Sequence, residues 1–112
     1  MIYAANSGGT GRKRVNRDKA TSRLLQETSR AIVTEWRFAP GAETGWHRHA
    51  HDYVVVVLTA GNLMQETDKG DIVTELAMGQ SYAREAGVEH NVVNPNAHEF
   101  VFFEIELKGG HA

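Results

Sequence analysis

Residues 45–58 read GWHRHAHDYVVVVL, so that three histidines at alternate positions come shortly before a run of valines. Successive side chains of an extended strand point to opposite faces, and His47 and His49 are therefore expected to share one face. The run from Tyr53 to Leu58 is continuously apolar, which is typical of a strand that is buried on both faces. This segment predicts β-structure in which two imidazoles lie side by side.

The chain beyond residue 20 shows the same kind of pattern, with short apolar stretches separated by turn residues. No stretch has a convincing helical period, and strands at spacings of about 8 to 12 residues favour an all-β sandwich or barrel. We expect residues 63–67 to return as the hairpin partner of residues 53–58. The strand candidates are residues 31–38, 53–58, 63–67, 72–76, 80–84, 88–93 and 99–107.

Composition and charge exclude several classes of protein. The 112 residues are enough for one domain and too few for two independent cores. Apolar residues make up 41% of the chain and the formal net charge is −2, so we expect a folded protein with no nucleic-acid or membrane partner. Because there is no cysteine, any metal must be held by nitrogen and oxygen ligands. No signal or membrane-spanning stretch is recognisable, and a cytoplasmic protein is expected.

The first 20 residues are predicted to form a flexible basic arm, and residues 21–112 to form the folded domain. The arm carries a cluster at Arg12–Arg14, followed by Arg17 and Lys19. Such a cluster is compatible with contact to a phosphate or nucleic acid. We favour the other interpretation, in which the arm is solvated or lies on a partner subunit.

A third histidine extends the pair into a candidate metal site. His90 lies in a separate strand candidate and is able to complete a set with His47 and His49. Neutral imidazoles suit iron, nickel, copper, zinc and, less strongly, manganese. Three ligands leave positions open for water or substrate, whereas structural zinc is usually closed by four. The alternative is a histidine-rich surface turn that binds nothing.

Two stretches of the chain, spanning residues 41–94, share a pattern of glycines and histidines. The first consists of Gly41, His47, Arg48, His49, Tyr53 and Gly61. The second consists of Gly79, Glu85, Ala86, Gly87, His90 and Asn94. These stretches resemble the two sequence motifs of the cupin superfamily. They depart from the family pattern at Tyr53, where glutamate is usual, at Gly61, which comes one residue late, and at Glu85, where proline is common.

The resemblance to small single-domain bacterial cupins carries several expectations. It implies an all-β fold, the double-stranded β-helix or jelly-roll barrel of that superfamily. It also implies one divalent transition metal per chain, either iron, manganese, nickel or zinc, on His47, His49 and His90. A homodimer is expected, because small cupins pair across a two-fold axis and this is the commonest closed assembly.

Tyr53 stands where the family has its fourth ligand, and its role is open at this point. A neutral phenol is a poor ligand and needs help to ionise, since its reference pKa is about 10. Tyr53 is therefore a candidate phenolate ligand, a candidate proton donor or acceptor for a bound substrate, or a residue that only fills space in the barrel.

Glu104 is the second candidate catalytic residue. Along residues 99–107 one face is wholly apolar, whereas Glu104 and Glu106 share the other face with two phenylalanines. If that face lines the cavity, Glu104 is a general base or a substrate clamp. If it faces solvent, which we favour, Glu104 is an ordinary surface acid.

Three further residues are candidates for substrate binding. Arg37 is able to hold a carboxylate if it lies near the mouth of the barrel. Trp46 precedes the histidine pair and Tyr82 lies in a strand candidate, so both are candidate walls of the cavity. His51 has the right parity to face inward, but we expect it at the rim and solvated.

These residues predict a divalent-metal-dependent enzyme that acts on a small polar oxygenated substrate. The metal stabilises developing negative charge on an oxygen, as isomerases and lyases require. With iron a dioxygenase is also compatible, because three-histidine iron sites are known among cupins. The alternatives are a non-catalytic module that binds a small molecule and a purely structural subunit.

Overall fold

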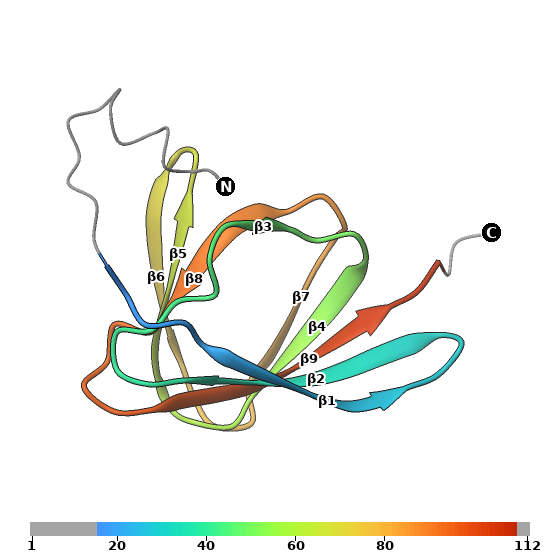
Figure 1. Cartoon of the computed structure of the whole chain (residues 1–112), viewed down its shortest axis with the longest axis horizontal. Helices are drawn as coiled ribbons and strands as arrows, with labels where there is room; N and C mark the ends of the chain where they lie inside the picture. The colour runs from blue at the N-terminus through green and yellow to red at the C-terminus, as the bar shows by residue number, and fades with distance from the viewer. Residues whose placement is uncertain (1–15, 110–112) are drawn as a thin grey trace.

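The computed structural model describes residues 16–109, in which nine strands and no helix are found (Figure 1). One sheet has the order β1-β2-β9-β4-β7 and the other the order β3-β8-β5-β6. This confirms the predicted all-β fold, a jelly-roll barrel. Within residues 16–109 no helix is long and apolar enough to cross a membrane. The strands are β1 Thr21–Glu27, β2 Ala31–Phe38, β3 His47–Arg48, β4 Asp52–Val57, β5 Gly61–Thr67, β6 Gly70–Leu76, β7 Ser81–Arg84, β8 Glu89–Val93 and β9 Phe100–Leu107.

The valine run forms β4, but it is buried on one face only. Tyr53, Val55 and Val57 are buried, whereas the alternating Val54 and Val56 are only partly covered. The prediction of a strand buried on both faces is therefore wrong. The alternation places Tyr53 and Val55 on the inner face, because side chains on a strand repeat every second residue.

The predicted hairpin between β4 and β5 is also wrong. Both edges of β4 are occupied by antiparallel partners, β7 on one side and β9 on the other. β5 lies in the second sheet, where it pairs with β6 and β8. Residues 58–60 therefore carry the chain from one sheet to the other instead of closing a hairpin.

β1 was not among the strand candidates. It is an edge strand that pairs only with β2, and six of its seven residues are exposed. A register shift between Leu24 and Gln26 interrupts its alternation. Because an exposed edge strand needs no apolar face, its sequence carries little of the period-two signal.

Residues 16–20 contact the barrel, although the prediction placed them in a flexible arm. The backbone carbonyl of Asp18 accepts the N–H of Glu43, and the carbonyl of Glu43 accepts the N–H of Ala20, at 2.9 and 2.8 Å. Arg17 forms ion pairs with acidic side chains of the barrel. Contacts with the barrel therefore begin before residue 21, and the basic cluster Arg12–Arg14 lies outside the described residues.

The hydrophobic core fills the space between the two sheets and forms the floor of a cavity. Phe38, Val57, Leu63 and Phe100 are at most 1% exposed. The rings of Phe38 and Phe102 lie 5.5 Å apart in a tilted arrangement. This packed interior supports the inner wall from which the functional side chains project.

Asn94 closes the second motif and is fully buried. Its side-chain amide donates to the carbonyl oxygens of Phe38, Ala39 and His98 at 2.9–3.2 Å. Its Oδ1 accepts the backbone N–H of Asn96 at 2.8 Å. Asn94 therefore satisfies backbone groups of two loops at once.

We expect Asn94→Ala to lower the free energy of unfolding by about 3 kcal/mol, because buried carbonyl groups lose their donors. Urea denaturation followed by circular dichroism measures this change. Asn62→Ala is the control, since Asn62 is exposed and its substitution is expected to change stability by less than about 0.5 kcal/mol. Equal midpoints for the two variants would contradict this account of Asn94.

Candidate metal centre

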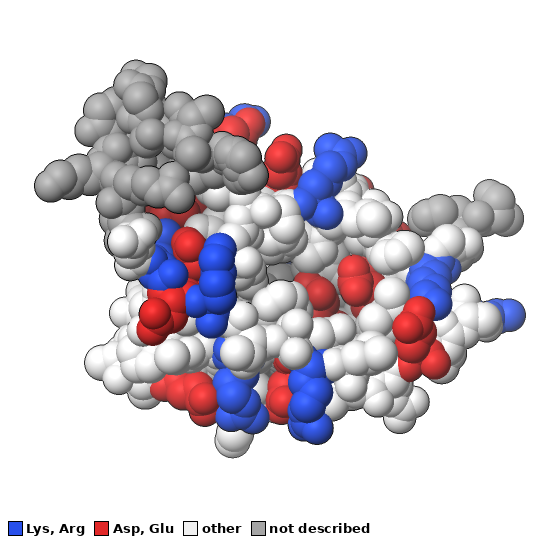
Figure 2. All heavy atoms as spheres, in the orientation of Figure 1, with Lys and Arg blue, Asp and Glu red and all other residues white. Residues whose placement is uncertain are grey.

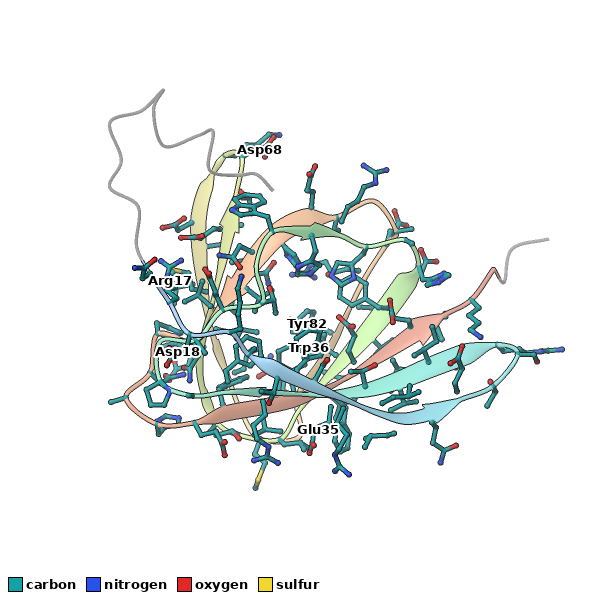
Figure 3. All side chains as sticks on the ribbon, viewed as in Figure 1. Arg17, Asp18, Glu35, Trp36, Asp68 and Tyr82 are labelled. Carbon is teal, nitrogen blue, oxygen red and sulfur yellow. The ribbon has the colours of Figure 1, made fainter. Side chains whose placement is uncertain are left out.

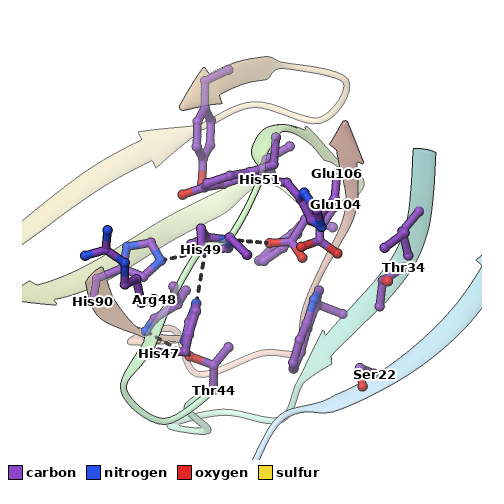
Figure 4. A pocket seen from close by; sticks show the side chains of 18 residues that line it. Ser22, Thr34, Thr44, His47, Arg48, His49, His51, His90, Glu104 and Glu106 are labelled. Atoms are coloured by element: carbon purple, nitrogen blue, oxygen red, sulfur yellow. Dashed lines mark hydrogen bonds and ion pairs between the residues drawn. The ribbon is translucent and has the colours of Figure 1, made fainter. Parts of the chain in front are cut away.

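Strand pairing brings three histidines to one point. His47 in β3 lies directly opposite His90 in β8. His49 follows β3 and is hydrogen-bonded to the residues that precede β8. Its N–H donates to the carbonyl of Val88, and its carbonyl accepts the N–H of Gly87. The Nε2 atom of His49 lies 3.1 Å from Nε2 of His47 and 3.2 Å from Nε2 of His90 (Figure 4).

The other ring nitrogens of His47 and His90 determine which nitrogen carries the proton. Nδ1 of His47 lies 2.8 Å from the carbonyl oxygen of Gly45, and Nδ1 of His90 lies 2.9 Å from Oε1 of Gln65. An oxygen of this kind only accepts, so Nδ1 must donate in both rings. When these rings are neutral, the Nε2 atoms of His47 and His90 carry no proton. Each then has a lone pair that points toward Nε2 of His49.

These lone pairs fit a metal ion. His49 has at most one proton on Nε2, which is too few to satisfy both neighbouring acceptors. A cation in contact with all three nitrogens satisfies them together, and separations of 3.1–3.2 Å are compatible with metal–nitrogen bonds of about 2.0–2.2 Å. The described residues thus contain a group able to hold an ion, consisting of His47, His49 and His90.

Burial keeps the rings of His49 and His90 neutral, as metal ligation requires. It lowers the pKa of His49 to about 4, and the proximity of His47 adds to the effect. It lowers the pKa of His90 to about 3, with smaller contributions from His47, His49 and Arg84. Both imidazoles are therefore neutral at pH 7, and each has one nitrogen without a proton that is available as a ligand.

Tyr53 packs against the site instead of pointing an ionised oxygen at it. Its ring stacks on His49 with centroids 3.8 Å apart and an angle of 19° between the planes. Burial raises the pKa of Tyr53, and Tyr82 and Glu104 raise it further, although Arg84 opposes them. The stacking and the raised pKa favour packing over ligation as a phenolate.

Glu104 lies inside the cavity, so the favoured prediction of a surface acid is wrong. Its side chain is 12% exposed, and its Oε2 lies 3.9 Å from Nδ1 of His49. Burial raises the pKa of Glu104 to about 7, and Glu106 contributes to the rise, whereas a hydrogen bond from Trp36 opposes it. Glu104 is thus a carboxyl group of perturbed acidity beside the histidines.

The cavity in front of the histidines has a volume of about 480 Å³. This volume is in the range of sites for small molecules. Apolar side chains form the inner wall, and Glu104 and Glu106 add carboxyl groups to it. Figure 2 shows acidic side chains near the middle of this face with uncharged residues around them. His51 also lines the cavity and is half-buried, whereas we expected it at the rim and solvated.

The three predicted substrate-binding residues lie in different places. Tyr82 lines the cavity, but neither Arg37 nor Trp46 is among the described residues that do. Arg37 is on the outer face of β2, where it pairs with Glu35 and Glu99. The structure therefore does not bring Arg37 to the cavity where the sequence predicted it.

Trp36 is a cavity residue that the sequence did not reveal. It lies between Glu35 and Arg37 on β2, so its side chain points to the opposite face from both. Figure 3 shows Trp36 and Tyr82 within the barrel opening, whereas Glu35 is outside it. The sequence pattern that could have identified Trp36 is its position between two charged residues, Glu35 and Arg37. If these two face outward, Trp36 faces inward.

Comparison with known proteins identifies similar sequences and folds. The cupin domain family matches residues 34–106. The β-alanine degradation protein BauB of Pseudomonas aeruginosa is 59% identical over 92 residues, which cover 82% of this chain and 97% of that protein. A cupin domain from Bordetella pertussis has a TM-score of 0.82 at 52% identity, covering 86% of this chain and 100% of that one. A Klebsiella pneumoniae protein with a double-stranded β-helix domain has a TM-score of 0.69 at 25% identity, covering 88% and 85% of the two chains.

Proposed function

The chain belongs to the cupin family, and we propose that it is a metal-dependent enzyme acting on a small polar oxygenated metabolite. The observation that carries this proposal is the convergence of three Nε2 atoms, belonging to His47, His49 and His90, on one side of an open cavity. A purely structural ion is usually enclosed by four protein ligands, whereas this arrangement offers three.

A divalent metal bound at this site supplies a Lewis acid for a substrate oxygen. Glu104 is the residue of this chain that is best placed to move a proton, because its carboxyl group lies in the cavity next to His49. As a base, its carboxylate takes a proton from the carbon next to a carbonyl. The O–H bond forms, the C–H bond breaks, and the electron pair moves to the carbonyl oxygen.

The surrounding residues support this role for Glu104. Trp36 donates a hydrogen bond to its carboxylate and so fixes its direction. Phe102 and Val55 exclude water from the inner wall of the cavity. Proton transfer of this kind belongs to isomerases and lyases, and these are the reactions that the cavity supports best. A dioxygenase reaction is the second candidate, because an ion held by three histidines has room on the cavity side for both a substrate and dioxygen.

We infer the substrate class from the size of the cavity and from the relative. BauB is named for the degradation of β-alanine. A cavity of about 480 Å³ easily holds a molecule of that size. Small β-amino acids, and the 3-oxo acids that arise when their amino group is removed, are therefore the first substrates to test. A 3-oxo acid carries both a carbonyl oxygen and an acidic C–H bond, as the proposed proton transfer requires.

The test compares metal-loaded and chelator-treated protein in D₂O with a panel of β-amino acids and 3-oxo acids. We expect metal-dependent exchange of deuterium into the carbon next to the carbonyl, observed by proton NMR, and oxygen uptake is recorded in parallel. Oxygen uptake without exchange would favour the dioxygenase. Absence of exchange, turnover and oxygen uptake, together with a ligand-dependent rise in melting temperature, would favour the non-catalytic binding module.

A further inference from the structure

A buried polar network lies behind the metal centre, on the far side of β8. Asn91 follows His90 in this strand, so its side chain points to the opposite face. Asn91 is 2% exposed and Glu66 is 5% exposed. The Nδ2 atom of Asn91 donates to Oε1 of Glu43 at 2.8 Å and to Oε1 of Glu66 at 2.9 Å. Both hydrogens of the amide are therefore held by carboxylates.

Arg17 closes this network from the segment that precedes β1. Its Nη1 lies 3.1 Å from Oε1 of Glu43, and its Nη2 lies 3.2 Å from Oε2 of Glu66. The side chain of Arg17 is 19% exposed, and those of Glu43 and Glu66 are 16% and 6% exposed. One guanidinium thus joins two carboxylates that would otherwise repel each other in a region with little water.

The side-chain oxygen of Asn91 connects this network to the metal centre through Gly45 and His47. This atom, Oδ1, accepts the backbone N–H of Gly45 at 2.8 Å. The carbonyl of the same glycine accepts Nδ1–H of His47 at 2.8 Å. Gly45 has a φ of +93°, a backbone conformation that residues with a side chain rarely adopt. Hydrogen bonds to both its N–H and its carbonyl group hold it in this conformation. The orientation of the His47 ring therefore depends on where Asn91 holds this glycine.

We propose that Arg17 is a positioning residue for the metal centre, acting through Glu43, Glu66 and Asn91 on Gly45 and His47. This inference rests on the proposed metal site. Without the guanidinium, the two carboxylates lose the cation that bridges them. Lys19 lies 3.7 Å from Oε2 of Glu43, but its side chain is 67% exposed and offsets less of their charge. The two carboxylates then repel each other more strongly and are expected to move apart. The side-chain amide of Asn91, which donates to both of them, is expected to move as well. A flip of Asn91 is no remedy, because its NH₂ group would then face the N–H of Gly45.

The position of Arg17 separates this role from direct contact with a substrate. Figure 3 shows Arg17 beside β5 and β6, away from Trp36 and Tyr82 in the barrel opening. Arg17 is not among the described residues that line the cavity. An effect of its substitution on metal binding must therefore pass through the polar network.

We expect Arg17→Gln to weaken Co²⁺ binding to the metal-free full-length chain by roughly tenfold, since loss of supporting partners typically costs about 10- to 100-fold in metal affinity. Competition with a chromophoric chelator measures the affinity. The absorption spectrum of bound Co²⁺ is expected to shift as His47 turns. The matched control is Arg23→Gln, because Arg23 on β1 forms an exposed ion pair with Glu35 on β2. We expect this control to bind Co²⁺ within about twofold of the parent.

Asn91→Asp is a second variant, which serves if Arg17→Gln does not fold. It preserves the size of the side chain and the acceptor for Gly45 but places a third carboxylate beside Glu43 and Glu66. We expect a still larger loss of Co²⁺ affinity. Parent-like affinity and an unchanged spectrum in either folded variant, with only a lower melting temperature, would overturn the inference. A parent chain that binds no Co²⁺ would overturn the proposed metal site and this inference together.

Discussion

Replacement of His90 by alanine is expected to remove stoichiometric metal from the purified protein. The parent is expected to contain about one transition-metal ion per chain, because the Nε2 atoms of His47, His49 and His90 converge on a point that one cation is able to occupy. Loss of a direct ligand is expected to lower the affinity by more than about 100-fold, the upper end of the cost of losing a supporting partner. Elemental analysis of untagged protein, purified without added metal, measures the metal content of the parent and of the His90→Ala variant. The same analysis identifies the ion.

His51→Ala is the matched control for this experiment. His51 belongs to the same histidine segment and lines the same cavity, but it is not part of the three-nitrogen group. We therefore expect this variant to retain metal at the level of the parent. Retention by both variants would refute His90 as a ligand, and loss from both would point to a general dependence on the histidine segment.

The sequence predicted which segments are extended better than which segments pair. The strand predicted for residues 31–38 has the same limits as β2. Local alternation and turn residues are enough for such a prediction, because they act within a few positions. The pairing of β4 with β7 and β9 involves residues far along the chain, so a local hairpin rule placed β5 beside the wrong strand.

The same distinction applies to the site. His47, His49 and His90 were found from their spacing and from the motif resemblance, and the structure brings their nitrogens together. The partners that orient two of them, Gly45 and Gln65, carried no such signal. A backbone carbonyl or an amide becomes a partner only through tertiary contacts, which sequence spacing does not reveal.

Glu104 shows why parity alone left two interpretations open. The face of β9 that carries Glu104 also carries Phe100 and Phe102, whereas the other face carries Val101, Phe103 and Ile105. Both faces are therefore rich in apolar residues, and neither is marked as the outer one. The pairing of β9 with β2 and β4 resolves this, because Glu104 lies opposite Thr34 and Val55, both of which line the cavity.

We expect Glu104→Gln to lower turnover of a responsive substrate by roughly 100-fold or more while the metal content is unchanged. A positioned acid or base typically contributes about 10²- to 10⁴-fold to the rate. Glutamine has the same size and still offers an oxygen to Trp36, so the wall of the cavity is preserved. Steady-state rates of deuterium exchange or turnover, normalised to bound metal, measure the effect.

Two further variants separate proton transfer by Glu104 from other roles of the cavity. Glu106→Gln removes the neighbouring carboxylate and is expected to change the rate by less than about tenfold, because the proposed base remains. Tyr53→Phe retains the ring that stacks on His49 and is expected to remain within a few-fold of the parent, since only the hydroxyl is lost. If Tyr53→Phe abolished exchange and Glu104→Gln did not, the proton would be moved by the phenol. Glu104 would then be no more than a wall of the cavity, and the stacked ring would serve to hold that hydroxyl towards the substrate.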